Sequence, residues 1–358
     1  MSAIEFGLQF FPNVSPAQKT GESYWSEALE LCALAEKLGF TSVRTVEHYF
    51  HSYGGYSPNP LLFLTAASMI TQKMRLISGA LLPAFNHPLK LAGEIGMLDA
   101  ISHGRLEVGF ARAFLPHEFA RFDVKPDESN GRFEEGVELV RRLLEDESVS
   151  TKGRFHQFEN VTSLPRPTQI PRPPFWIAAL ATPSSFERAG RLGYDVMAIP
   201  LAGGQMAELI GSYREARARA GHDGPGRVML AFHMLCAESE DAAVALARVP
   251  LNAYLEDLVD AASGWITGLR SRDYPQYDVI VRGLSRETFE TQRAKGAAWV
   301  GTPDSITQQI MEYHREVGGF DIASLQVNFN VLSITVAISS MRLFASAVMP
   351  RFRQRETS

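Results

Sequence analysis

Short apolar runs alternate with longer amphipathic stretches through most of the chain. The short runs are apolar on both faces, as expected of parallel strands that are buried on both sides. The longer stretches, such as residues 24–40, 87–102, 133–147 and 303–319, have the spacing of helices that connect such strands. The eight predicted strands are residues 4–10, 42–46, 74–82, 105–110, 174–180, 194–199, 227–235 and 322–329.

Eight successive strands with helical crossovers favour a closed (β/α)8 TIM barrel over an open, doubly wound sheet. The open sheet is disfavoured further because no glycine-rich dinucleotide fingerprint follows the first strand. Barrels of this kind routinely use a chain of 358 residues as one domain. We therefore expect one α/β barrel domain over residues 1–358.

Two segments interrupt the alternation of strands and helices. Residues 148–175 predict a hairpin around 151–161, followed by a proline-rich extended connection. Residues 249–298, which follow the seventh predicted strand, are much longer than an ordinary strand-to-helix connection. Segments of that length are usually lids or binding elements, so we expect a lid here.

The composition narrows the class of protein. The formal net charge is -5 and the chain has no basic block, which makes nucleic acid an unexpected partner. The N-terminal residues do not resemble a secretion signal, and the apolar stretches are too short to span a bilayer. Cys32 and Cys236 lie far apart in apolar surroundings, as reduced core residues do. We expect a soluble cytoplasmic protein without a membrane partner.

In a barrel, functional groups gather at the carboxyl ends of the strands. Glu47 and His48 stand side by side at one such end, although burying either group unpaired is costly. No cluster of carboxylates and histidines converges in the sequence, so we expect no metal. A few polar groups among many small and apolar ones suit a large planar cofactor. The strand-end positions are Phe10, Phe11, Glu47, His48, Ser78, Gly79, Arg112, residues 178–182 and His233.

Several motifs resemble those of the luciferase-like flavin-dependent monooxygenases, the family of bacterial luciferase. They are "VEHYF", "SPNP", "SGALLPAFNHPLKLAGEIGMLDAISHGRLEVGFAR", "PPFWIAALATPSSFERAGRLGYDVM", "GTPDSITQQIMEYH" and the closing "MRLFASAVMPRFR". The resemblance covers nearly the whole chain and is weakest between residues 235 and 295. It is the combination of motifs that is specific to the family.

The resemblance implies that His48 and Glu47 are the candidate catalytic pair. His48 matches the histidine that acts in the family's flavin chemistry, and an imidazole suits a group that must exchange protons. Glu47 is expected to orient it, and the alternative is that His48 only caps a strand. Tyr49 replaces the family's second histidine. His87 matches a recurrent family position, where a structural role at a helix start is equally open.

A mononucleotide phosphate needs backbone donors at a helix start, with a cation or hydroxyl groups nearby. Thr182 can cap such a helix, Pro183 fits its first turn, and Ser184 and Ser185 add hydroxyls. The alternative for the serines is capping without a ligand. By resemblance, Arg112 is the arginine that contacts the flavin phosphate.

Other flavin contacts are implied by the resemblance alone. Ala179 and Leu180 replace a glutamate and a serine of luciferase, so the backbone around Ala178 and Ala179 would serve in place of those side chains. Ala111 replaces the cysteine near the flavin, which excludes thiol chemistry there. The family's non-proline cis peptide beneath the ring is expected at Ser78–Gly79, where glycine relieves the steric cost.

Aromatic residues near the strand ends could line an apolar substrate pocket above the flavin, with His233 beside them. An aromatic set of this kind more often packs in the core, which stays open as the alternative to at least three of them facing the substrate. The candidates are Phe10, Phe11, Tyr49, Tyr53, Tyr56, Phe110 and Phe114.

The resemblance implies a two-component FMN-dependent monooxygenase. A separate reductase would supply reduced FMN, and O2 would oxygenate a small apolar organic substrate through a peroxyflavin. A homodimer is expected by resemblance, whereas the substrate, the type of oxygenation and light emission are not predicted. The alternatives are a deazaflavin-dependent oxidoreductase on the same barrel, a non-catalytic flavin-binding partner subunit and, more remotely, a metal-dependent barrel hydrolase.

Overall fold

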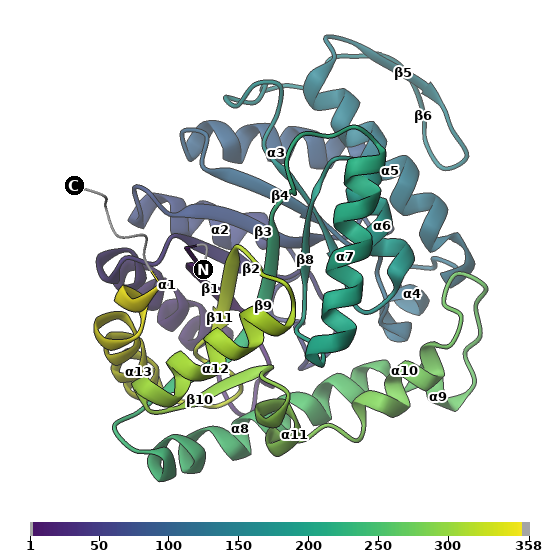
Figure 1. Cartoon of the computed structure of the whole chain (residues 1–358). Helices are drawn as coiled ribbons and strands as arrows, with labels where there is room; N and C mark the ends of the chain where they lie inside the picture. Colours follow the sequence, from purple (N-terminus) through teal and green to yellow (C-terminus); the bar gives the residue numbers. More distant parts are fainter. Residues whose placement is uncertain (1–2, 353–358) are drawn as a thin grey trace.

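Eight parallel strands close into a barrel in the computed structural model, which describes residues 3–352 (Figure 1). Their order is β1-β2-β3-β4-β7-β8-β9-β11, and β11 pairs with β1 to complete the ring. The predicted TIM barrel is confirmed. The barrel strands are β1 (Glu5–Phe10), β2 (Ser42–Thr45), β3 (Arg75–Leu81), β4 (Leu106–Phe110), β7 (Phe175–Ala179), β8 (Asp195–Ala198), β9 (Val228–Cys236) and β11 (Ile322–Gln326).

A further parallel strand, β10 (Ala298–Gly301), pairs with the last residues of β9, His233 to Cys236. The sequence prediction missed it and placed its first residue in the lid segment. The strand has four residues and pairs with β9 alone, so it produces no apolar run as long as those of the barrel strands.

Helices cover the outer surface of the barrel and bury the apolar faces of its strands. Most start at a polar side chain that accepts a hydrogen bond from the first turn, for example Thr20, Asn59, His87 and Thr302. The helices up to β9 are α1 (Gly21–Leu38), α2 (Pro60–Ile70), α3 (Pro88–Ile101), α4 (Pro116–Arg121), α5 (Ser129–Glu145), α6 (Pro183–Arg191) and α7 (Gly203–Arg219), with a 3-10 turn at Pro126–Glu128. The last helices are α12 (Pro303–Glu316) and α13 (Ile334–Ala347), with a 3-10 turn at Met349–Arg351.

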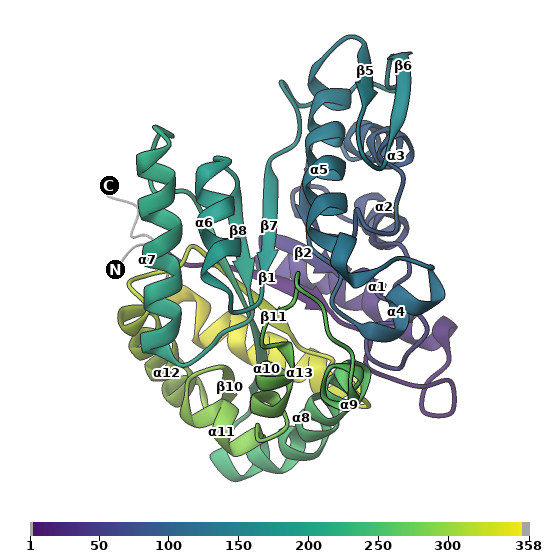
Figure 2. The same cartoon turned by 90° about the vertical axis from the view of Figure 1, so that its right-hand side faces the viewer.

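The predicted hairpin is present as β5 (Val149–Lys152) and β6 (Gln157–Val161), which lie at the outer edge of the molecule beyond α5 (Figures 1 and 2). The proline-rich connection that follows it lies against α3. A side chain on Gly96 would collide with the carbonyl oxygen of Pro165, so glycine permits this close approach. Gln169 adds two hydrogen bonds to the buried carboxylate of Asp99, at 2.9 and 2.7 Å.

The predicted lid segment is mostly helical. It includes the second part of α8 (Glu240–Ala262), which begins before the predicted lid, and all of α9 (Gly264–Thr267), α10 (Tyr277–Leu284) and α11 (Phe289–Ala294). These helices lie along one side of the barrel in both views (Figures 1 and 2). We call α8 to α11 the helical cover. Its apolar side chains, among them Leu251, Leu258 and Trp265, are buried in one cluster with residues of the strand ends such as Phe11 and Tyr53. Within residues 3–352, no helix is both long and apolar enough to cross a membrane.

Candidate active site

A cavity lies where the carboxyl ends of the barrel strands meet the helical cover. Strand ends gather there because parallel strands all finish at the same end of a barrel. Of the residues predicted from the sequence, those that line the cavity are Phe11, Glu47, His48, Tyr53, Gly79, Arg112, Phe114, Ala178, Ala179, Leu180, Thr182, Ser185 and His233.

Phe10 and Phe110 do not line the cavity. Between ring centroids, Phe10 packs against Phe63 of α2 at 5.3 Å, and Phe110 packs against Phe175 of the neighbouring strand β7 at 4.9 Å. Successive side chains of a strand point to opposite faces, so the neighbour of an inward residue is directed outward.

Tyr49, Ser78 and Ser184 also lie outside the cavity lining. Tyr49 packs against Phe122, with 4.7 Å between ring centroids. The hydroxyl of Ser78 accepts a hydrogen bond from the N–H of Gly109 at 2.9 Å, and Ser184 is exposed. Neither the hydroxyl of Ser78 nor that of Ser184 is directed to the cavity.

The non-proline cis peptide joins Gly79 to Ala80, so the prediction of Ser78–Gly79 is wrong by one residue. Ser78 still pairs in register with Val108 of β4, and the irregularity of the strand begins after it. A side chain on Gly79 would collide with the methylene groups of Arg44, which explains why glycine precedes the cis bond. Ser78, Gly79 and Ala80 are all small, so the residue types alone could not show which of the two peptide bonds is cis.

His48 is buried, and its Nδ1 lies 3.0 Å from Oε1 of Glu118. Glu118 comes from α4 and is fully buried. The same oxygen accepts a hydrogen bond from the N–H of Tyr49 at 2.9 Å. These contacts fix the imidazole, and its Nε2 has no hydrogen-bond partner among the described residues.

Glu47 interacts with different partners. Its Oε1 accepts hydrogen bonds from the hydroxyl of Tyr49 at 2.6 Å and from the amide of Asn86 at 2.7 Å, while Oε2 accepts from the N–H of Leu82 at 3.1 Å. Burial raises the pKa of Glu47 to about 7, although these hydrogen bonds oppose the shift. Glu47 therefore orients Tyr49, and the carboxylate that contacts His48 comes from α4 instead.

Hydroxyl groups line one end of the cavity at the start of α6. Thr182 occupies the N-cap position, as predicted, but its side chain does not cap the helix. Its hydroxyl lies 2.8 Å from the hydroxyl of Ser185 instead. Both hydroxyls therefore remain close to the first turn of α6, where backbone N–H groups favour an anion.

Two guanidinium groups adjoin these hydroxyls. Arg112 donates to Oδ1 of Asn130 at 3.1 Å, and Arg188 donates to the same oxygen at 3.3 Å. Burial and then the charge of Arg112 lower the pKa of Arg188, and Glu134 partly offsets both effects. Arg188 also forms an ion pair with the exposed Glu134 at 3.0 Å, whereas Arg112 pairs with no carboxylate among the described residues, so an unpaired positive charge suited to an anion remains at this end. The sequence prediction missed Arg188, which lies within α6 and not at a strand end.

Aromatic rings form another part of the cavity wall. Phe11 and Tyr53 lie 4.4 Å apart between centroids, and the hydroxyl of Tyr53 lies 3.3 Å from that of Tyr254 in α8. The ring of His233 lies 4.5 Å from that of Tyr254. Burial lowers the pKa of His233 to about 3, so this imidazole is neutral near pH 7.

Two further charged groups near the cavity were missed by reading only the strand ends. Arg44 lies in the middle of β2 and lines the cavity floor, and Glu118 lies in a short helix after β4. A signal for Arg44 was present, because it is the one charged residue of a short strand whose four residues are all buried. No comparable pattern singled out Glu118.

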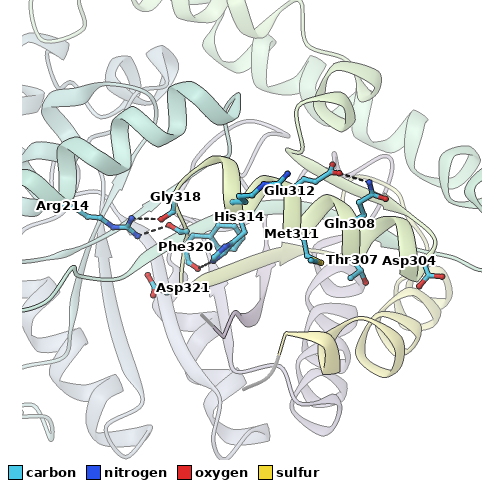
Figure 3. A pocket seen from close by; sticks show the side chains of 12 residues that line it. Arg214, Asp304, Thr307, Gln308, Met311, Glu312, His314, Gly318, Phe320 and Asp321 are labelled. Carbon is cyan, nitrogen blue, oxygen red and sulfur yellow. Dashed lines mark hydrogen bonds between the residues drawn. The ribbon is translucent and has the colours of Figure 1, made fainter. Parts of the chain in front are cut away.

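A separate hollow lies between α7, α12 and the loop before β11 (Figure 3). In it, Arg214 donates to the carbonyl oxygens of Gly318 at 2.9 Å and Gly319 at 3.0 Å. Its lining mixes cations and carboxylates, including Asp304 and Glu312. It is located where β11 begins, the end of a barrel that contributes to stability and not to catalysis.

The family model for luciferase-like monooxygenases matches residues 4–318. The chain belongs to this family. The family assignment made from the motifs is thus confirmed, and the chain is a flavin-dependent monooxygenase.

Similar proteins support the same assignment of this luciferase-like monooxygenase. The oxygenase component of the flavin-dependent trigonelline monooxygenase from Acinetobacter baylyi is 34% identical, with 94% of this chain and 92% of that protein covered. The monooxygenase RslO1 from Streptomyces bottropensis is 40% identical, with a TM-score of 0.87 and coverage of 98% and 100%.

More distant structures share the fold. The oxygenating constituent of 3,6-diketocamphane monooxygenase from Pseudomonas putida, solved with FMN, is 20% identical, with a TM-score of 0.80 and coverage of 98% and 99%. An F420-dependent secondary alcohol dehydrogenase is 18% identical, with a TM-score of 0.76 and coverage of 99% and 100%.

The cavity of this luciferase-like monooxygenase fits a flavin that carries a phosphate. One end has two guanidinium groups and two hydroxyls at a helix start, which suit a phosphate. Small residues, Gly79, Ala178 and Ala179, line the region between that end and His48 and leave room for a flat ring.

Proposed function

We propose that this luciferase-like monooxygenase is the oxygenase component of a two-component system. It would take reduced FMN from a separate reductase and use O2 to oxygenate a small apolar organic substrate. The relative that is 34% identical over most of both chains is itself named an oxygenase component, which supports this assignment.

The observation that carries the proposal is the division of the cavity into a cationic end and an aromatic wall. Thr182, Ser185, Arg112 and Arg188 would hold the phosphate of FMN. The aromatic and aliphatic side chains opposite would accept a substrate without charge, mainly through apolar contact. The lining residues of that wall include Phe11, Tyr53, Phe114, Tyr254, Leu255 and Leu258.

Reduced flavin, when bound, supplies the electrons that activate dioxygen. The chain's own residues contribute orientation, proton handling and the exclusion of water. His48 would hold or donate a proton at Nε2, while Glu118 fixes the ring through Nδ1 at 3.0 Å. The apolar cover excludes water from the reacting atoms, and the neutral His233 adds no charge to the substrate wall.

The proposal is tested by the fate of reduced flavin. We expect anaerobic titration to show that the protein binds reduced FMN, and that oxidised flavin then appears more slowly on mixing with O2 than it does without protein. An equal rate with and without protein would contradict a protected oxygenation site. Tight binding of reduced F420 with no binding of FMN would assign the chain to deazaflavin chemistry instead.

We also propose that the chain forms a homodimer through its early helices. Large apolar side chains are exposed there: Leu62 and Met69 of α2 are 70% and 73% exposed, and Met97 of α3 is 57% exposed. Neighbouring helices that expose side chains of this kind are typical of subunit contacts.

A further inference from the structure

Arg44 is a buried cation on the floor of the cavity. It projects from β2 and is only 7% exposed, and its methylene groups pack against Gly79, which begins the cis peptide. Its Nη1 lies 3.5 Å from Sδ of Met197. Within residues 3–352, no carboxylate forms an ion pair with Arg44, and its Nε has no hydrogen-bond partner.

An arginine in this state is unusual because burying a cation without a counter-ion is costly. Burial lowers the pKa of Arg44 to about 10, so the group still carries its charge near pH 7. The fold alone does not explain such a charge at the centre of a barrel, since an apolar side chain of similar volume would fill the space at lower cost. The charge is explained if the floor receives an anion.

A buried hydrogen-bond acceptor lies beside this cation. Gln9 of β1 is directly opposite Arg44 in the strand register. The amide nitrogen of Gln9 donates to Oε1 of Gln326 at 3.4 Å, and Gln326 donates in turn to the carbonyl oxygen of Phe11 at 3.1 Å. These two hydrogen bonds fix the orientation of the Gln9 amide. Its Oε1 is left without a partner among the described residues.

The cavity floor thus offers a charged donor and a neutral acceptor side by side. The pyrimidine edge of a flavin presents the complementary pattern: an N–H between two carbonyl groups, with the negative charge of the reduced ring spread over N1 and the adjacent oxygen. A carboxylate substrate fits less well, because Oε1 of Gln9 would repel one of its oxygens. The separate phosphate end, with Arg112 and Arg188, leaves the floor free for the ring.

We propose that Arg44 and Gln9 form the binding site for the pyrimidine edge of the flavin ring. Arg44 is the counter-ion of the reduced, anionic ring, and Gln9 accepts the ring N–H, which is present in both oxidation states. The inference rests on the proposed use of FMN. It assigns to Arg44 the preference for the reduced cofactor over the oxidised one.

Anaerobic titrations with reduced and oxidised FMN separate the two roles. Arg44→Met should lose at least about tenfold more affinity for reduced than for oxidised FMN, which lowers the two-electron potential of the bound flavin by about 30 mV. Arg44→Lys keeps the charge and should retain most of the preference. Gln9→Leu is the matched control on the neighbouring strand, and it should weaken both oxidation states alike.

A second measurement needs no flavin. In the flavin-free protein, Arg44→Met should unfold at the same temperature as the wild type or a higher one, because it removes an unpaired buried charge. A markedly lower unfolding temperature would show that Arg44 is structural, which contradicts the proposal.

The outcomes separate this inference from the proposed function. Wild-type protein that binds neither form of FMN would refute both. Wild-type protein that binds FMN, with Arg44→Met unchanged or weakened equally for both forms, would refute the role of Arg44 alone. Unchanged flavin binding with a loss of substrate binding would place the anion site on the substrate and also overturn the proposal.

Discussion

At the scale of single residues, the environment of His48 is built by a part of the chain far from it in sequence. Glu118 is 70 residues away from His48 and contacts the imidazole from a short helix. Glu47, next to His48 in the sequence, instead accepts a hydrogen bond from the hydroxyl of Tyr49. A carboxylate that bonds both Nδ1 and the next backbone N–H holds the ring in one orientation. This arrangement makes Glu118 a positioning residue for His48.

Replacing Glu118 tests that role. We expect Glu118→Gln to reduce kcat by about tenfold to a hundredfold with little change in KM, less than the roughly 10²–10⁴-fold attributed to a proton-transfer group itself. Steady-state kinetics measure both parameters.

The control for this variant is Glu94→Gln, because Glu94 pairs with Lys90 on the surface of α3. It should leave both kinetic parameters unchanged. If Glu118→Gln raised KM as strongly as it lowered kcat, Glu118 would act on the fold of the site and not on the orientation of His48.

Glu47 predicts a dependence of stability on pH. Its pKa is raised from 4.5 to about 7, so the native state keeps a proton that the unfolded chain has lost between these values. The free energy of unfolding therefore falls as pH rises through this range. We expect Glu47→Gln to gain stability relative to the wild type, on the order of 1–3 kcal/mol, between about pH 5 and about pH 8.

Denaturant unfolding at several pH values measures this difference, with Glu94→Gln again as the control. A constant difference between Glu47→Gln and the wild type would mean that Glu47 is ionised throughout this range in the native state.

At the scale of elements, the barrel strands were predictable because each is an apolar run of the right length with a helix after it. The direction of individual side chains was harder to predict. Phe10 and Phe11 are neighbours at one strand end, yet only Phe11 lines the cavity, because the strand period of two directs Phe10 outward. A strict alternation of faces, counted back from His48, would also have placed Arg44 on the inner side.

Other parts of the site depend on tertiary contacts that no local pattern contains. Glu118 and Arg188 lie in helices and meet the cavity only when those helices pack on the barrel. The choice between the two peptide bonds around Gly79 depends on where β3 departs from its register with β4. The start of α6 was predicted from local signals, namely Thr182 at the N-cap and Pro183 in the first turn. The helix begins there in the structure.

The start of α6 gives a prediction at this scale. Arg188→Met should weaken FMN binding by about tenfold to a hundredfold, the range expected for lost hydrogen bonds to a charged group, about 1.5–3 kcal/mol. Riboflavin has the same ring without the phosphate, so its affinity should not change. Titration of the wild type and the variant with both ligands measures the effect.

An equal loss for the two ligands would show that Arg188 acts through the fold of α6 or through the ring. A loss for neither would remove this arginine from the phosphate site and leave Arg112 as its principal cation.

At the scale of the whole molecule, the proposed homodimer depends on the apolar side chains of α2 and α3. We expect the protein to sediment as a dimer and the combined variant Leu62→Lys, Met69→Lys and Met97→Lys to sediment as a monomer, because charges introduced at a contact oppose association. Val279→Lys with Met311→Lys changes two apolar residues elsewhere that are 62% and 50% exposed, and this variant should remain dimeric. A monomeric wild type would contradict the proposal.

The helical cover is one continuous stretch of the chain. The proposed phosphate end of the cavity and its floor come from the barrel and α6. In the proposed arrangement, this stretch supplies Tyr254, Leu255 and Leu258 of the substrate wall, while Phe11, Tyr53 and Phe114 of that wall lie outside it. Recombination that exchanged residues 240–297 between two family members could change what is oxygenated while keeping the flavin site intact. In a working chimera, the backbone of the exchanged segment must keep its position at residue 273. The carbonyl oxygen of Asp273 accepts a hydrogen bond from Arg112, outside the segment, at 2.8 Å.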